Sequence, residues 1–216
     1  MKYLVTLCLF LFCIKTVSRC LSFRYNLGGN IVGTVFEALE RSPIIAATDR
    51  EGWKTAASSL AEVLFHLDAN IMTVSDDIAL AKQNGKFVFV HIDLAEGIGK
   101  DRAGIAWLKG LGADGIITTR TQLVRAAADC GLLAIQRFFV LDSKGMNSIA
   151  ENVGKAAPDM IEIMPGVIPK ALKLFSGQKI PVIAGGLIET EHEVTVALSA
   201  GAFAVSTGKR LLWQEN

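Results

Sequence analysis

The stretch IPVIAGGLIETEHEVTVALSAGAFAVSTG, residues 180–208, contains two short apolar runs with a helix-length segment between them. The runs are residues 180–184 and 202–205, and the segment is residues 190–199. Runs that are apolar at nearly every position are typical of parallel strands buried on both faces. The stretch therefore predicts a strand–helix–strand unit of an α/β protein.

The same alternation extends through the chain from Pro43 onward. Glycines mark the ends of the helix-length segments, as is usual for helix C-termini. We expect eight strands, at residues 43–47, 63–67, 87–92, 115–117, 132–140, 160–164, 180–184 and 202–205. We expect helices at residues 51–60, 73–83, 101–110, 121–130, 143–155, 169–176 and 190–199. Eight strands spaced in this way indicate a (β/α)8 barrel of the TIM type.

A doubly wound open sheet is the alternative fold, but no G-x-G-x-x-G pattern follows the first strand. We expect one barrel domain at residues 43–216 and an N-terminal extension at residues 1–42 that the barrel does not need. The extension contains an apolar run at residues 3–14, typical of a signal peptide or of an over-extended start, and a short helix is possible at 34–40.

Composition narrows the function classes. The 216 residues carry 22 basic and 21 acidic side chains, so overall charge gives no case for nucleic-acid binding, which would need a local patch. Three of the four cysteines fall within the first 20 residues, and only Cys130 lies in the barrel region. The barrel thus lacks a disulfide framework and metal-binding spacing, and we expect a cytoplasmic protein without cofactor or metal, and without a membrane role unless residues 1–20 act as a signal or anchor.

Glycine-containing turns follow the last two expected strands. Gly185 and Gly186 follow one strand, and Ser206, Thr207 and Gly208 end the other. Bare backbone lets a ligand approach N–H groups closely, and a short helix beginning near Lys209 would add its dipole. The strands of a barrel end at its functional mouth, so we expect a phosphate site here. Tight turns alone would also explain the glycines.

Other polar residues end the earlier strands. His91 and Asp93 lie two apart and so share a face of their strand, where they could serve in acid–base chemistry, bind a metal or bind a polyol. Glu162 stands among apolar neighbours and needs a cation, either Arg120 or Arg137. Further candidates at the mouth are Arg120, Gln136 and Arg137. An arginine with the neighbouring Phe138 or Phe139 would also suit RNA, but the strand favours the alternative that both phenylalanines belong to its core.

Six segments in this order resemble the glycerol uptake operon antiterminator family of bacteria: FVFVHIDLAEGIGKD, ADGIITTR, LLAIQRFFVLDS, PDMIEIMPGVIPK, IPVIAGGLIET and AGAFAVSTG. The resemblance covers about residues 43–213. It implies a barrel that binds glycerol 3-phosphate and, once liganded, binds leader mRNA and lets transcription pass a terminator; a homodimer is possible. Residues 185, 186 and 206–208 would then hold the phosphate, and His91, Asp93 and Glu162 would lie near the glycerol.

Two functions compete at this point. One is the ligand-gated RNA-binding regulator. The other is a phosphate-barrel enzyme, an isomerase or phosphodiesterase acting on a small phosphorylated polyol with His91, Asp93 and Glu162 as its reactive groups. One His–Asp pair without a cluster of carboxylates favours the regulator, and we expect no catalytic residues.

Overall fold

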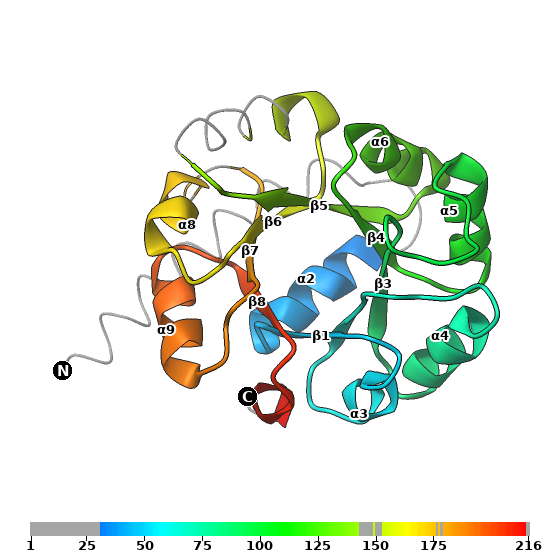
Figure 1. Ribbon diagram of the computed structural model, residues 1–216, viewed down its shortest axis with the longest axis horizontal. Helices are drawn as coiled ribbons and strands as arrows, with labels where there is room; N and C mark the ends of the chain where they lie inside the picture. Colours follow the sequence, from blue (N-terminus) through cyan, green and yellow to red (C-terminus); the bar gives the residue numbers. More distant parts are fainter. Residues whose placement is uncertain (1–30, 143–148, 150–152, 176, 178, 215–216) are drawn as a thin grey trace.

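The computed structural model describes residues 31–142, 149, 153–175, 177 and 179–214. Eight parallel strands pair in sequence order, and the eighth pairs with the first, which closes the barrel (Figure 1). The strands are β1 Ile44–Thr48, β2 Val63–His66, β3 Phe87–His91, β4 Gly115–Thr118, β5 Leu133–Phe139, β6 Met160–Met164, β7 Val182–Gly185 and β8 Ala204–Thr207. The predicted (β/α)8 fold is confirmed.

Helices surround the barrel as a ring (Figure 1). They are α3 Trp53–Ala57, α4 Val74–Gln83, α5 Arg102–Gly110, α6 Thr121–Cys130, α8 Pro169–Phe175 and α9 Glu191–Ser199, with the 3-10 helix η1 Arg210–Gln214 after β8. Residues 153–156 are also helical; the rest of the helix expected at residues 143–155 lies mostly outside the described residues. The helix expected near Lys209 is the five-residue η1, whose short 3-10 geometry adds little dipole.

Two apolar clusters correspond to the two faces of the sheet. One lies between the strands and the ring of helices and contains residues such as Val90, Ile161 and Leu172. The other fills the barrel interior and contains residues such as Phe89 and Ile183. Successive residues of each strand alternate between the clusters, because side chains of a strand point to opposite faces. This alternation decides which polar residues at the strand ends face the interior.

A helix before the barrel belongs to the interior cluster. Helix α2, Ile31–Arg41, buries Val35, Phe36, Ala38 and Leu39 in it. Phe36 contacts the ring of Phe203, which precedes β8, at a centroid distance of 6.0 Å. The helix therefore covers the N-terminal ends of the strands, opposite the mouth.

The domain boundary expected between residues 42 and 43 would separate α2 from the barrel, although the buried residues of α2 belong to the interior cluster of the barrel. The domain limits themselves, and the fold of a chain without residues 1–42, stay predictions. Because the buried face of α2 lies in the barrel interior, we revise the expectation that the barrel does not need residues 1–42 and expect α2 to be required for stability. The signal-like run at residues 3–14 lies outside the described residues. Among the described helices, none has the length and apolar character needed to cross a membrane.

Candidate ligand site at the barrel mouth

Polar residues line the C-terminal end of the barrel interior. Each of five residues stands two positions after a member of the interior cluster on its own strand, so each faces inward. They are His91, Arg137, Glu162, Gly185 and Ser206. Five of the predicted site residues, from strands β3, β5, β6, β7 and β8, therefore meet at one end of the barrel.

Glu162 joins two of these side chains. Its carboxylate accepts a hydrogen bond of 2.5 Å from Arg137 Nε and one of 2.6 Å from Ser206 Oγ. Glu162 is only 1% exposed, and Arg137 and Ser206 are also buried. Removal of one partner from a buried ion pair typically costs 3–5 kcal/mol. The cation required by Glu162 is thus Arg137, and the expected alternative, Arg120, does not contact it.

Gly185 makes room for this arrangement. A Cβ atom at residue 185 would lie 2.3 Å from Glu162 Oε1 and 2.7 Å from Ser206 Oγ. The next residue, Gly186, has a φ of 75°, which disfavours other residue types. At Gly208 a Cβ would lie 3.5 Å from the carbonyl oxygen of Ala47, an ordinary contact. The two glycines of the β7 turn are therefore sterically required, and the glycine after β8 is not.

Two predicted site residues face away from the interior. Gln136 donates from Nε2 to Thr121 Oγ1 of α6 at 3.2 Å. Thr207 donates to the carbonyl oxygen of Ile188 at 2.7 Å, and its hydroxyl accepts from Lys209 N at 3.0 Å. Thr207 thus ties the turns after β7 and β8 together from behind. Both side chains belong to the layer between strands and helices, and neither meets the interior group.

Asp93 organises the end of β4. Its carboxylate accepts from Thr118 Oγ1 at 2.9 Å, from Thr119 N at 2.7 Å and from Thr119 Oγ1 at 3.0 Å. Burial acts to raise the pKa of Asp93, but these hydrogen bonds and nearby His91 together hold it below its ordinary value. Arg120 Nε lies 3.5 Å from Asp93 Oδ1, and its side chain is half exposed at the rim. The segment TTR is therefore a platform for Asp93, in which the two threonines matter as much as the arginine.

His91 is buried beside this carboxylate, and its Nδ1 atom has no hydrogen-bond partner. Burial, together with the positive charge of Arg137, lowers the pKa of His91 below its ordinary value. The imidazole is therefore neutral at neutral pH, with a polar nitrogen available to a ligand.

The other strand-end histidine has a structural role. His66 Nε2 lies 3.1 Å from Asp77 Oδ2, and the ring stacks on Trp53 at 4.4 Å. Both partners belong to the helix layer, so His66 stays outside the mouth and is a core histidine. Within the described parts of the chain, no group of three or more His, Cys, Asp or Glu side chains is arranged to hold a metal ion.

A family described as "Glycerol-3-phosphate responsive antiterminator" matches residues 44–213. The chain belongs to this family. The uncharacterized protein YgcP of Escherichia coli (strain K12) is 37% identical over 179 residues, which cover 81% of this chain and 93% of YgcP.

Two solved structures are similar in both sequence and fold. A glycerol uptake operon antiterminator-related protein from Thermotoga maritima is 34% identical, with a TM-score of 0.72, over 80% of this chain and 98% of that one. A glycerol uptake operon antiterminator regulatory protein from Listeria monocytogenes is 33% identical, with a TM-score of 0.75, over 81% and 96%. A deoxyribose phosphate aldolase from Aeropyrum pernix, 14% identical with a TM-score of 0.61 over 86% and 97%, shares the fold alone.

Proposed function

We propose that this protein is a glycerol-3-phosphate-responsive antiterminator, a cytoplasmic regulator that binds leader mRNA when it holds its ligand. Membership of the antiterminator family supports this role. The observation that carries the ligand assignment is the buried chain Arg137–Glu162–Ser206 beside the two glycines of the β7 turn.

This chain offers both kinds of group that a phosphorylated polyol needs. Arg137, Ser206 and the backbone of the β7 and β8 turns donate hydrogen bonds, which a phosphate accepts. Glu162 and Asp93 accept hydrogen bonds, which the hydroxyls of glycerol donate. We assign Arg137 to the ligand because it is buried, whereas Arg120 lies exposed at the rim.

The ligand competes with an interaction within the protein. Arg137 and Ser206 now donate to Glu162, so a phosphate that takes these donors frees the carboxylate for the glycerol hydroxyls. Hydroxyls that reach Asp93 act on the platform at the start of α6. A switch between mostly inactive and mostly active states requires a preference of about 5.5 kcal/mol, which a few hydrogen bonds to charged groups can supply.

The enzyme alternative has less support. An isomerase or phosphodiesterase would use Glu162 as a reactive group. Arg137 and Ser206 instead hold this carboxylate in buried hydrogen bonds.

Calorimetric titration with glycerol 3-phosphate tests the ligand assignment. We expect Gly186→Val and Ser206→Ala to weaken binding at least about tenfold, equal to ~1.4 kcal/mol. Gly85→Val and Ser199→Ala are the matched controls, because Gly85 also has a positive φ and Ser199 is exposed on α9. Equal affinity of all four variants would refute the assignment.

Leader RNA then tests the regulatory role. Electrophoretic mobility shifts with and without saturating glycerol 3-phosphate compare the two states of the protein. We expect tight binding only with the ligand. Equal binding in both states would contradict the switch, and turnover of the ligand would favour the enzyme.

A further inference from the structure

Charge is unevenly distributed around the barrel. Residues 100–179 carry 11 Lys and Arg against 7 Asp and Glu, whereas residues 31–99 and 180–216 together carry 7 against 14. Lys144 and Glu151 of the first set lie outside the described residues, and its described helices α5, α6 and α8 lie on one side of the ring (Figure 1). A near-neutral chain thus has a basic side and an acidic side, and an anionic polymer would be drawn to the basic one.

The exposed surface of α5 concentrates this basic character. Arg102 and Lys109 lie near its two ends, and Lys100 precedes it; all three are exposed. Within the described part of the chain, none of the three pairs with a carboxylate, in contrast to Arg41 and Arg50, which do. Lys109 Nζ donates one hydrogen bond to the carbonyl oxygen of Cys130, and its other N–H groups, like those of Lys100 and Arg102, remain available to phosphate groups.

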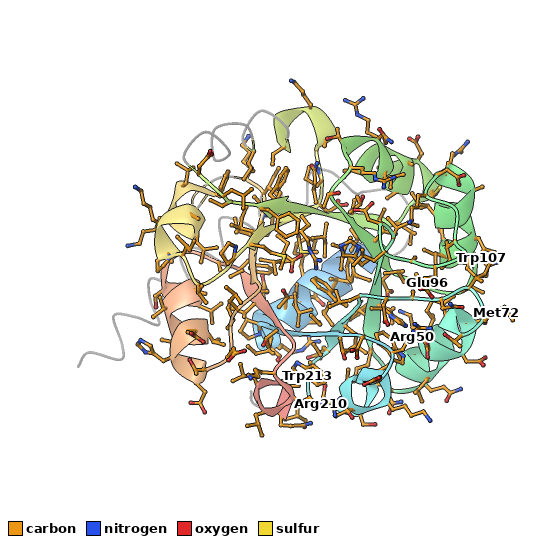
Figure 2. All side chains as sticks on the ribbon, viewed as in Figure 1. Arg50, Met72, Glu96, Trp107, Arg210 and Trp213 are labelled. Atoms are coloured by element: carbon orange, nitrogen blue, oxygen red, sulfur yellow. The ribbon has the colours of Figure 1, made fainter. Side chains whose placement is uncertain are left out.

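An exposed aromatic side chain, Trp107, lies on the same helix, but it lines a different hollow from Arg102 and Lys109, one that also contains Asp101. Trp107 is 39% exposed, while the other two tryptophans, Trp53 and Trp213, are 1% and 0% exposed. Figure 2 shows Trp107 at the outer edge of the molecule, whereas Trp213 lies by the 3-10 helix after β8. A large exposed aromatic ring is a platform on which a base can stack, while the cations on the other side of the same helix bind the phosphates of the strand.

Hollows flank the helix on both sides. One, of about 510 Å³, is lined by Arg102, Ala103, Ala106, Lys109 and Cys130, between α5 and α6. The other, of about 290 Å³, contains Trp107 and Ile71 in its lining. The small side chains Ala103 and Ala106 keep the surface between the cations low, so flat groups can approach the backbone of the helix.

We propose that the exposed surface of α5, formed by Lys100, Arg102, Ala103, Ala106, Trp107 and Lys109, is the docking surface for single-stranded RNA. The cations bind phosphates and Trp107 stacks on a base. The proposal rests on the RNA binding proposed above. The proposed surface lies on the side of the barrel, on the helix next to α6, whose first residues follow the Asp93 contacts with Thr119 and Arg120.

Tryptophan fluorescence provides a direct readout, because Trp107 is the exposed tryptophan of the three. The protein, saturated with glycerol 3-phosphate, is titrated with its leader RNA and with a single-stranded RNA of about 16 nucleotides, the upper end of a one-domain site. We expect quenching that Trp107→Phe abolishes. Ultraviolet crosslinking followed by trypsin should place the RNA on the peptide Ala103–Lys109.

Affinity measurements complete the test. Trp107→Ala should weaken RNA binding about tenfold, the loss typical of one stacked base, and Trp107→Phe should retain most of it. Arg102→Ala with Lys109→Ala should lower the salt slope by about 1.4, since each phosphate contact contributes about 0.7 on single strands. The control, Lys54→Ala with Arg41→Ala, removes the same charge from exposed positions on α3 and α2, which lie outside the basic side.

The outcomes separate the two proposals. If wild-type protein binds leader RNA and the α5 variants bind it equally well, the docking surface is wrong and the regulatory function stands. If wild-type protein binds neither RNA in the presence of the ligand, both fall. A change of Trp107 fluorescence with protein concentration alone would show that α5 contacts a second copy of the chain, which also overturns the proposal.

Discussion

Helix α2 gives the most direct test of the fold. Leu39 is 1% exposed and lies with Val35 and Phe36 in the cluster that fills the barrel interior. Substitution of a buried leucine by alanine costs about 2–5 kcal/mol, depending on how far the cavity can collapse. A loss of 1 kcal/mol lowers the melting temperature of a chain of this size by about 2–4 °C. Leu39→Ala should therefore lower it by roughly 4–20 °C.

The measurement is thermal and urea unfolding followed by circular dichroism, with Glu40→Ala as the control. Glu40 is exposed on the same helix, and alanine favours helix slightly more than glutamate does, so this variant should stay within about 0.5 kcal/mol of wild type. A chain that starts at Arg41 should be much less stable than the full chain. If Leu39→Ala and Glu40→Ala have the same stability, or the shortened chain is as stable as the full one, α2 is not part of the core. The barrel would then not need residues 1–42, as the sequence predicts.

Three further predictions concern the mouth. In calorimetry, Gly185→Ala should weaken glycerol 3-phosphate binding at least about tenfold (~1.4 kcal/mol), because the new Cβ displaces Glu162. Gly208→Ala should bind normally, because a Cβ fits at that position. Equal losses in the two variants would contradict the steric argument. Glu162→Gln should lower the free energy of unfolding, measured in urea, by about 3 kcal/mol, because it breaks a buried ion pair. Glu62→Gln breaks an exposed ion pair and should lower it by less than about 1 kcal/mol. Similar values would mean that the buried ion pair stabilises the fold no more than the exposed one. Because folding lowers the pKa of His91, the unfolded chain binds more protons than the folded one below about pH 6.5. The free energy of unfolding should therefore fall as the pH drops from there toward the folded pKa. His91→Asn should reduce this pH dependence, and an unchanged dependence would show that His91 is not its source.

The barrel was predictable from the sequence because its strands are apolar on both faces and alternate with helices of regular length. The same property hides the direction of each side chain. In LLAIQRFFV both faces of the strand are apolar, so the pattern does not show whether Gln136 or Arg137 points inward. The structure turns Arg137 to Glu162 and Gln136 to Thr121, and only the closed register of β4, β5 and β6 decides this.

The packing of helix α2 was not predictable from the sequence for a different reason. Its apolar positions are visible in the sequence, but a helix before the first strand can cover either end of the barrel or neither. The choice is made by contacts that are distant in the chain, such as that between Phe36 and Phe203. A local pattern therefore shows that a helix has an apolar face, and tertiary packing determines what the face covers.

The contact between Glu162 and Ser206 gives Gly185 a role that the sequence pattern did not predict. Strands β6 and β8 are not neighbours, because β7 lies between them. Glu162 crosses β7 to reach Ser206 only where β7 ends in Gly185, since any Cβ there would occupy the path of the carboxylate. The glycine was expected to expose backbone to a phosphate, and in the structure it also opens the interior to a side chain. A ligand phosphate that took these donors would compete with the Glu162 carboxylate, which would then give up Arg137, Ser206 or both. Through that exchange, ligand binding at the mouth would change the contacts between strands β5, β6 and β8, which carry Arg137, Glu162 and Ser206.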